Sequence, residues 1–227
     1  MKRFIYEPIP EYDRATAIQE IESGVTERVT GALLALAFYD SDWLYVQNLC
    51  IEHAKNSNQS IRGTAILCFG HLARIHRKLQ TEIAVPLVIE ALQDSTDYVR
   101  GCADDTLEDL LIFCTSEDYE RTSALEQLES RRIDAVLLAL YAIAKHDVDV
   151  GFVQAKCIEY AHHPNQVIRG QALKGFATMV YEHRQIGSDQ IMLILSEASK
   201  TDDYAGQCAR AAIECIETYM QAADNRI

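Results

Sequence analysis

The chain has 227 residues, enough for one domain or two small ones with a substantial hydrophobic core. It carries 34 acidic and 21 basic residues, and the resulting net charge of −13 argues against binding a phosphate backbone and favours attraction of a basic partner. Solubility alone explains the same acidity equally well. No apolar run approaches the roughly 18 residues of a membrane span, and the N-terminal residues lack the apolar core of a signal peptide. We therefore expect a cytoplasmic protein with no membrane partner.

Sparse turn-forming residues indicate long helices. Only 4 prolines and 10 glycines occur, whereas a β-sandwich needs frequent turns. The 7 cysteines are odd in number, include no C-x-x-C pair and fall within apolar helical patterns. We therefore expect them to be small buried side chains in a reducing compartment.

Apolar residues recur at helical spacing along the whole chain, in segments that come in pairs. In the first half we expect helices at about residues 11–22 and 25–39, 42–56 and 59–77, and 82–93 and 96–114. In the second half we expect them at about 117–129 and 132–145, 149–162 and 166–184, and 188–199 and 203–221. Polar residues suited to capping a helix start precede several of these segments, namely Asp42, Asn58, Ser95 or Thr96, Asn165 and Ser188.

The second half of the sequence repeats the first at a shift of 107 positions. The clearest match sets residues 58–63 (NQSIRG) against residues 165–170 (NQVIRG), and Asp40 falls on Asp147. After a one-residue deletion the match continues, so that Tyr98 meets Tyr204. Self-similarity at a fixed spacing is the mark of repeat architectures. It predicts three helix pairs in residues 1–115 and a duplicated set of three in residues 116–227, forming one continuous solenoid.

The second helices of several pairs open with a common pattern. It stands in Asn58-x-x-Ile61-Arg62-x-x-Ala65, Asp97-Tyr98-Val99-Arg100-x-x-Ala103 and Asn165-x-x-Ile168-Arg169-x-x-Ala172. This pattern resembles the D-x-x-V-R-x-x-A signature of HEAT repeats, and the resemblance covers most of the chain. It implies an all-α fold, an α-solenoid of about six HEAT-like helix pairs arranged as two duplicated halves. It also implies that the Asx caps its helix, the Ile or Val enters the core and the Arg pairs with a neighbouring repeat. The second helix of the last pair opens at Asp203 and departs from the pattern, because it has no Arg at the signature position.

The sequence carries no motif of a known catalytic chemistry. It has no G-x-x-x-x-G-K-[ST], G-x-S-x-G or H-E-x-x-H motif and no EF-hand loop. His71 and His76 are five positions apart, the wrong spacing for joint metal ligation on a helix face. His162 and His163 lie at a helix end, where the last carbonyls favour a cation, so we interpret them as capping residues. We therefore expect a protein that is not an enzyme and has no catalytic residue, metal or cofactor.

An acidic cluster is the sharpest candidate for a binding surface. On the helix expected at 96–114, four acidic residues avoid the buried stripe, namely Asp104, Asp105, Glu108 and Asp109. Their i,i+4 spacing places like charges together, which destabilises an isolated helix by about 0.2–0.5 kcal/mol per pair. One interpretation is an unneutralised landing site for Lys and Arg side chains of a partner. The other, of equal weight, is a solvated face partly compensated by Arg100.

A second candidate is an aromatic cluster at a turn between helices. It joins the only tryptophan, Trp43, to Tyr39, Asp40 and Asp42. Trp and Tyr are common anchors of protein interfaces, which makes this turn a candidate for partner binding. Packing of Trp43 in the core is the alternative, and we favour it.

Several classes of function fit a helical-repeat chain, and binding to another protein is the general expectation. In size, acidity and lack of catalytic motifs the chain resembles bacterial toxin immunity proteins of the contact-dependent growth inhibition type. That resemblance implies a basic protein partner, a toxin nuclease domain whose active site is occluded, with no direct contact to nucleic acid. The alternatives are a HEAT-like DNA-alkylation-repair glycosylase, which the net charge disfavours, and a general scaffold or adaptor. The sequence fixes neither the partner nor the oligomeric state.

Overall fold

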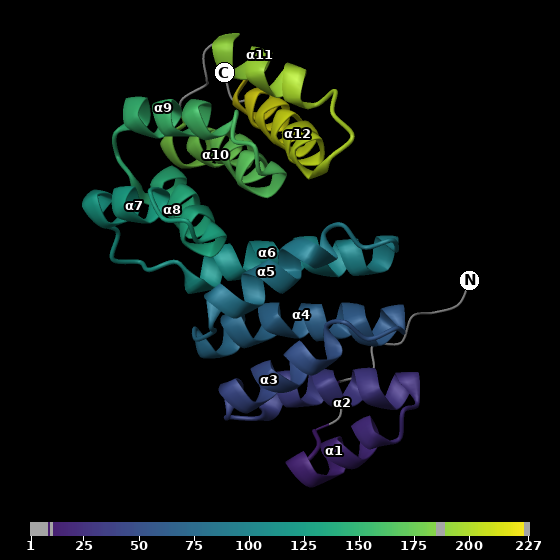
Figure 1. Cartoon of the computed structure of the whole chain (residues 1–227). Helices are drawn as coiled ribbons and strands as arrows, with labels where there is room; N and C mark the ends of the chain where they lie inside the picture. Colours follow the sequence, from purple (N-terminus) through teal and green to yellow (C-terminus); the bar gives the residue numbers. More distant parts are fainter. Residues whose placement is uncertain (1–8, 10, 185–188, 225–227) are drawn as a thin grey trace. The chain divides into compact units, whose positions relative to one another are not determined.

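All regular secondary structure that the structure describes is α-helical. The computed structural model describes residue 9, residues 11–184 and residues 189–224, and twelve helices occur in these ranges (Figure 1). The chain divides into two compact units, unit 1 (residues 1–114) and unit 2 (residues 115–227). The all-α class expected from the sequence is therefore confirmed, and pairs of packed helices are compatible with an α-solenoid. The boundary between the units lies one residue before the expected division after residue 115.

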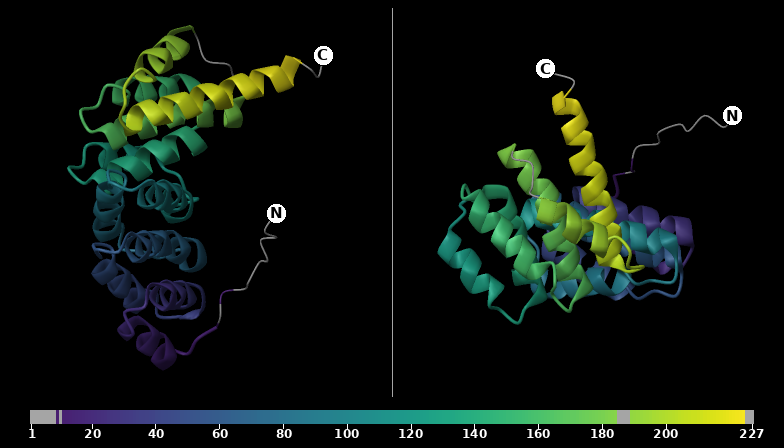
Figure 2. Two further views of the ribbon diagram at one scale, coloured as in Figure 1. Left: turned by 90° about the vertical axis from the view of Figure 1, so that its right-hand side faces the viewer. Right: turned by 90° about the horizontal axis from the view of Figure 1, so that it is seen from above.

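Unit 1 consists of three helix pairs. Its helices are α1 (Arg14–Glu22), α2 (Thr26–Tyr39), α3 (Trp43–His53), α4 (Gln59–His76), α5 (Thr81–Ala91) and α6 (Asp97–Cys114). In each pair the first helix packs against the second, and α4 also packs against both α2 and α6. The second helices α2, α4 and α6 therefore form one layer, which α1, α3 and α5 cover (Figures 1 and 2).

Unit 2 has the same order of elements. Its helices are α7 (Arg121–Leu128), α8 (Ile133–His146), α9 (Val150–Tyr160), α10 (Gln166–His183), α11 (Asp189–Ala198) and α12 (Tyr204–Asp224). The long helix α10 packs against α8, α9 and α12, while α7 and α11 pack on α8 and α12. As in unit 1, the second helix of each pair contributes to a common layer (Figure 2).

Three consecutive helices of unit 2 begin and end 107 residues after their counterparts in unit 1. The bounds 26–39, 43–53 and 59–76 of α2, α3 and α4 become 133–146, 150–160 and 166–183 in α8, α9 and α10. The backbone also corresponds just past the longest helices, where Arg77 and Arg184 have left-handed φ angles of 53° and 52°. The 107-residue spacing of the sequence is thus also the spacing of these helices.

Side-chain caps set the starts of several helices. Asp42, Asn58 and Asn165 each accept a hydrogen bond from a backbone N–H in the first turn, as expected from the sequence. Asp149, the counterpart of Asp42, caps α9 in the same way. The expected cap Ser188 lies outside the described residues.

The long second helices carry much of the core. Phe69 of α4 and Phe176 of α10 occupy corresponding positions and are both fully buried. Burying a side chain of this kind stabilises the folded state by about 1.5–3 kcal/mol. The close approach of α6 to α4 depends on Gly63, because a Cβ there would lie 2.5 Å from Cε1 of Tyr98. The layer of second helices is therefore tightly packed in unit 1.

Arginines tie each central helix pair to the next. Arg62 at the start of α4 donates from Nε and Nη2 to the two carboxylate oxygens of Asp94, which precedes α6, over 2.8 and 3.1 Å. Arg169 at the start of α10 donates from Nη2 to the carboxylate of Asp203, which precedes α12. The expectation that these two arginines bind the neighbouring helix pair is therefore confirmed.

Two other arginines behave differently. Arg100 pairs with Asp97 and donates to the carbonyl oxygen of Asp94 over 2.6 Å, and both of these partners lie in its own helix pair. In the last pair, which lacks the signature arginine, Arg210 donates to the carbonyl oxygens of Ser199 (2.6 Å) and Thr201 (3.2 Å). Arg210, which lies further along α12, thus binds the loop that precedes this helix.

The cysteines are all free, and most are buried in the helix layers. The buried thiols are those of Cys50, Cys68, Cys102, Cys157 and Cys208. Burial raises the pKa of the Cys157 thiol to about 12, so it is protonated at neutral pH. Cys114 is only half-buried and Cys215 is exposed, so the expectation of uniform burial is wrong for these two. Cys215 follows the exposed Glu214 and lies on the solvent side of α12, although its neighbour Ile216 is buried.

Candidate functional site

The acidic cluster expected from the sequence lies on α6. We call its four residues, Asp104, Asp105, Glu108 and Asp109, the α6 acidic stripe. Asp105 and Glu108 are exposed, and Asp104 and Asp109 are partly exposed. The opposite face of the same helix is buried, so the stripe is held on a fixed element of the second-helix layer.

The negative charge of Asp109 is neutralised by an arginine of a neighbouring helix. Its carboxylate accepts a hydrogen bond of 2.6 Å from Nη2 of Arg74 on α4, and only 13% of its side chain is exposed. The guanidinium of Arg74 also lies 5.7 Å from the centre of the Phe113 ring on α6. The expectation of an unneutralised stripe therefore does not hold at Asp109, because this residue joins α6 to α4. Among the four carboxylates, those of Asp105 and Glu108 are the exposed ones.

The turn between α2 and α3 brings the other predicted residues together. Asp40 accepts two hydrogen bonds from Arg14, of 2.7 and 2.6 Å, and one of 2.8 Å from the backbone N–H of Asp42. The bonds from Arg14 are the main reason that the pKa of Asp40 lies below its ordinary value. Asp42 caps α3 by accepting a hydrogen bond of 3.1 Å from the N–H of Tyr45. Both carboxylates thus hold the turn in shape.

The corresponding turn of unit 2 is built in the same way. Arg121 pairs with Asp147, and Tyr119 donates its hydroxyl to the same carboxylate over 2.6 Å. Burial raises the pKa of Asp147, but the hydrogen bonds from Arg121 and Tyr119 outweigh it and hold the pKa below its ordinary value. In both units the arginine also lies over an aromatic ring, Tyr45 in one and Phe152 in the other. The acidic residues of these turns are structural in both units.

The aromatic residues of the α2–α3 turn remain available to a partner. Tyr39 is 48% exposed, and its hydroxyl donates to the carbonyl oxygen of Ile9 over 3.3 Å. Trp43 is the first residue of α3 and is half-buried. Trp43 is therefore neither a core residue, which was the favoured interpretation, nor a fully exposed anchor.

Helix α4 separates the two predicted groups while connecting the helices that carry them. The ring of His71 on α4 lies 4.6 Å from that of Phe38 on α2, and Arg74 one turn later reaches Asp109 on α6. Burial lowers the pKa of His71, and the charge of Arg74 lowers it further, which keeps the imidazole neutral at pH 7. Sequence reasoning missed this role of His71 and Arg74, because no local pattern shows what a side chain contacts on another helix.

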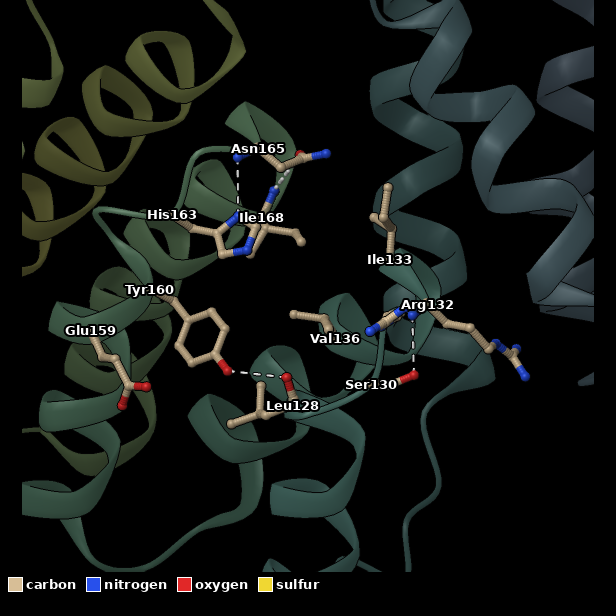
Figure 3. A pocket seen from close by; sticks show the side chains of 11 residues that line it. Leu128, Ser130, Arg132, Ile133, Val136, Glu159, Tyr160, His163, Asn165 and Ile168 are labelled. Carbon is tan, nitrogen blue, oxygen red and sulfur yellow. Dashed lines mark hydrogen bonds between the residues drawn. The ribbon is translucent and has the colours of Figure 1, made fainter.

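Unit 2 contains a pocket that sequence reasoning did not predict. Its volume is about 480 Å³, and it lies between the α7–α8 and α9–α10 pairs (Figure 3). The lining residues are Leu128, Ser130, Arg131, Arg132, Ile133, Val136, Glu159, Tyr160, His163, Asn165 and Ile168. In Figure 3 the rings of Tyr160 and His163 form one wall, and Ile133 and Val136 lie on the opposite side. The pocket is thus lined by apolar side chains and a small set of polar ones.

Internal bonds hold the polar wall of this pocket. The Tyr160 and His163 rings are stacked with 6.0 Å between centroids, and the Tyr160 hydroxyl donates to the carbonyl oxygen of Leu128 over 3.2 Å. Nδ1 of His163 accepts a hydrogen bond of 3.1 Å from the backbone N–H of Asn165. His163 therefore binds the start of the next helix, and this corrects the interpretation that it caps the last carbonyls of the preceding one.

The corresponding place in unit 1 is bridged by a hydrogen bond. There Nδ2 of Asn58 donates to Oγ1 of Thr26 over 2.8 Å. In unit 2 the counterpart of Thr26 is Ile133, whose side chain offers no acceptor to Asn165. Differences between the aligned halves could have indicated this pocket. The alignment also pairs Arg131 of unit 2 with Gly24 of unit 1.

A second groove of about 430 Å³ lies between α10 and α12 and is almost wholly apolar. Its lining includes Tyr181, which is 68% exposed, and the exposed Cys215. In unit 1 the counterparts of these two residues are Arg74 and Asp109, whose ion pair joins α4 to α6. Unit 2 therefore has an open apolar groove at the place where unit 1 has an ion pair between two helices.

Comparisons of the chain with protein-family models, with curated proteins and with solved structures found no match. Within residues 9, 11–184 and 189–224, no group of three or more His, Cys, Asp or Glu side chains is placed to hold a metal ion. The helices of the described part include none that is long and apolar enough to cross a membrane. A function for this chain therefore has to be argued from the chemistry of its own surfaces.

Proposed function

We propose that this chain is a protein-binding module whose α6 acidic stripe receives lysine and arginine side chains of a basic partner. The supporting observation is the exposure of Asp105 and Glu108, with Asp104 beside them, on a helix whose other face is buried. Carboxylates one turn apart on a helix repel one another. A cationic partner relieves that repulsion, and the Arg74 guanidinium already does so at Asp109.

The two units are, in this proposal, duplicated halves of HEAT-like helix pairs. The 107-residue offset of three helices and the matched left-handed residues after α4 and α10 support it. The arginines Arg62 and Arg169, which bind the following helix pair, support it as well. A stack of such pairs presents its second helices side by side, which gives α6 a place on an extended binding face.

The partner that best fits is the basic nuclease domain of a toxin, and the chain then acts as a cytoplasmic immunity protein. Its net charge of −13 steers a basic domain towards it, and fixed carboxylates occupy positions that phosphates of the nucleic acid substrate would take. Tyr39, exposed on the same layer of helices, supplies an aromatic contact of the kind found at interface centres. Inhibition follows from occlusion of the active site, with no reaction catalysed by this chain.

Affinity capture from the native host with matched bait proteins tests the proposal. One bait is the wild-type chain, and a second carries Asp104→Lys, Asp105→Lys and Glu108→Lys. The control bait carries Glu126→Lys, Asp202→Lys and Glu217→Lys, three exposed residues of unit 2, so that its net charge is the same as that of the second bait. Bound proteins are identified by mass spectrometry, and the captured partner is assayed for nuclease activity with and without each bait.

The expected result is a stoichiometric basic nuclease that the wild-type and control baits capture and inhibit, and that the α6 variant does not. Equal capture by all three baits would remove the α6 acidic stripe from the interface. Capture of a protein without nuclease activity would favour a scaffold or adaptor, and bound DNA would favour the glycosylase class.

A further inference from the structure

The pocket of unit 2 presents three hydrogen-bond donors that no acceptor in the described structure satisfies. Arg131 lines the pocket and makes no ion pair or hydrogen bond with any described residue. His163 accepts at Nδ1, so its neutral ring carries the proton on Nε2, which has no described partner. The Asn165 side chain uses its oxygen to cap α10, and its Nδ2 amide has no described acceptor either. A ligand group with several acceptor oxygens matches this arrangement.

The other residues that line the pocket indicate what the rest of the ligand is like. Leu128, Ile133, Val136 and Ile168 are apolar, and the stacked Tyr160 ring adds a flat surface. A volume of about 480 Å³ falls within the range of pockets that hold small organic ligands. The ligand is thus amphiphilic, with an apolar body and a polar head.

The charges around the pocket favour a head group with a single negative charge. Arg132 also lines the pocket, but its side chain points away in Figure 3 and pairs with Asp134 over 2.5 Å. Glu159 points away from the pocket as well and pairs with Lys156 over 2.8 Å. Arg131 is then the one full positive charge of the lining that is left for a ligand. The planar guanidinium fork binds a carboxylate through two parallel hydrogen bonds.

We propose that this pocket binds a small carboxylic acid with an apolar body, its carboxylate held by Arg131 and its body lying between Tyr160 and Val136. His163 and Asn165 donate the remaining hydrogen bonds to the carboxylate. The site is peculiar to unit 2, because unit 1 has Gly24 in place of Arg131 and bridges the space through Asn58 and Thr26. It does not depend on the protein-binding function, since it lies in the other unit.

Calorimetric titration of the full chain with four probes of equal chain length tests this site. The probes are octanoate, octyl phosphate, octanol and octylammonium. Octanoate is expected to bind at least about tenfold more tightly than octanol or octylammonium, because octanol offers one neutral acceptor oxygen and octylammonium offers none. Octyl phosphate, with up to two charges, is expected to bind more weakly than octanoate at pH 8. Equal affinity for octanol and octanoate would overturn the proposal.

Variants locate the binding. Arg131→Gln removes the charge from an exposed side chain, and Ile133→Thr restores the hydroxyl that unit 1 offers to its asparagine. Each variant is expected to bind octanoate about tenfold or more weakly than the wild type does. The circular dichroism spectrum of each variant should match that of the wild type. The control Tyr181→Ala alters the apolar groove between α10 and α12 and is expected to leave octanoate affinity unchanged. Loss of octanoate binding in Tyr181→Ala with full binding in Arg131→Gln would place the ligand in the other groove and refute this site.

Discussion

Arg62 and Asp94 form an ion pair through two hydrogen bonds, and the guanidinium holds the pKa of the Asp94 carboxyl at about 2. The ordinary value for this group is 3.8. A carboxyl whose pKa is lower in the folded than in the unfolded chain stabilises the fold at higher pH. That stabilisation is fully present above about pH 5 and is lost as the pH falls through about 4 towards 2. The pKa of Asp203 is also lowered: burial raises it, but hydrogen bonds from the Thr201 hydroxyl and the Gly206 N–H, together with the Arg169 charge, outweigh that effect.

The first prediction concerns the Arg62→Gln variant. We expect its free energy of unfolding at pH 6 to be about 1–3 kcal/mol below that of the wild type, because a half-buried charged hydrogen bond is lost. At pH 3 the difference is expected to shrink, since the wild type has by then lost part of the contribution of Asp94. Urea unfolding at both pH values measures this. A difference of equal size at pH 6 and pH 3 would show that Asp94 is not the linked group.

The second prediction compares two helical glycines of unit 1. A Cβ on Gly63 would lie 2.5 Å from a ring atom of Tyr98, whereas a Cβ on Gly31 would meet nothing within 4 Å. Gly63→Ala is therefore expected to lower the free energy of unfolding by about 1–3 kcal/mol through overpacking. Gly31→Ala is expected to raise it by about 0.5–1 kcal/mol, because alanine is the better helix former. Thermal unfolding of the two variants provides the comparison, and destabilisation by both would contradict it.

The helix pairs could be predicted because helices are determined largely by residues that are close together in the sequence. Apolar periodicity and the capping residues Asn58 and Asn165 set the long second helices, so the expected segment 59–77 differs from α4 by one residue. The first helix of unit 1, expected from residue 11, begins at Arg14. Its cap is Asp13, which was not among the caps expected from the sequence. Weak apolar periodicity in these short helices leaves their starts poorly determined.

The candidate sites depend on contacts between distant residues, which composition and spacing do not show. Asp109 looked like part of an open stripe, because its partner Arg74 lies 35 positions away on another helix. At the pocket of unit 2, Ile133 stands where unit 1 has Thr26. That difference was visible in the sequence, but its meaning required the hydrogen bond from Asn58 to Thr26.

The third prediction concerns the reactivity of the seven thiols. Cys215 is exposed, Cys114 is half-buried with its pKa raised by burial to about 11, and the other five are buried. A disulfide reagent such as dithionitrobenzoate attacks thiolates that it can reach, so one thiol is expected to react fast in the folded chain. Cys215→Ser should remove the fast phase, and denaturation should expose all seven. Several fast-reacting thiols in the native wild type would mean that the helix layers open readily.

The last prediction separates the structural carboxylate of α6 from an exposed one. Asp105 and Asp109 stand one turn apart, but only Asp109 has an ion pair with Arg74 and a mostly buried side chain. We expect Asp109→Asn to lower the free energy of unfolding by about 0.5–1 kcal/mol, a modest value because the Arg74 side chain is half exposed.

For Asp105→Asn, relief of like-charge repulsion should leave that free energy unchanged or raise it by a few tenths of a kcal/mol. Denaturant unfolding of the two variants at low and high salt distinguishes these outcomes, since added salt should reduce the gain in Asp105→Asn most. A loss of stability in Asp105→Asn as large as that in Asp109→Asn would mean that this acidic residue serves the fold. The reason to assign Asp105 to a partner would then be gone.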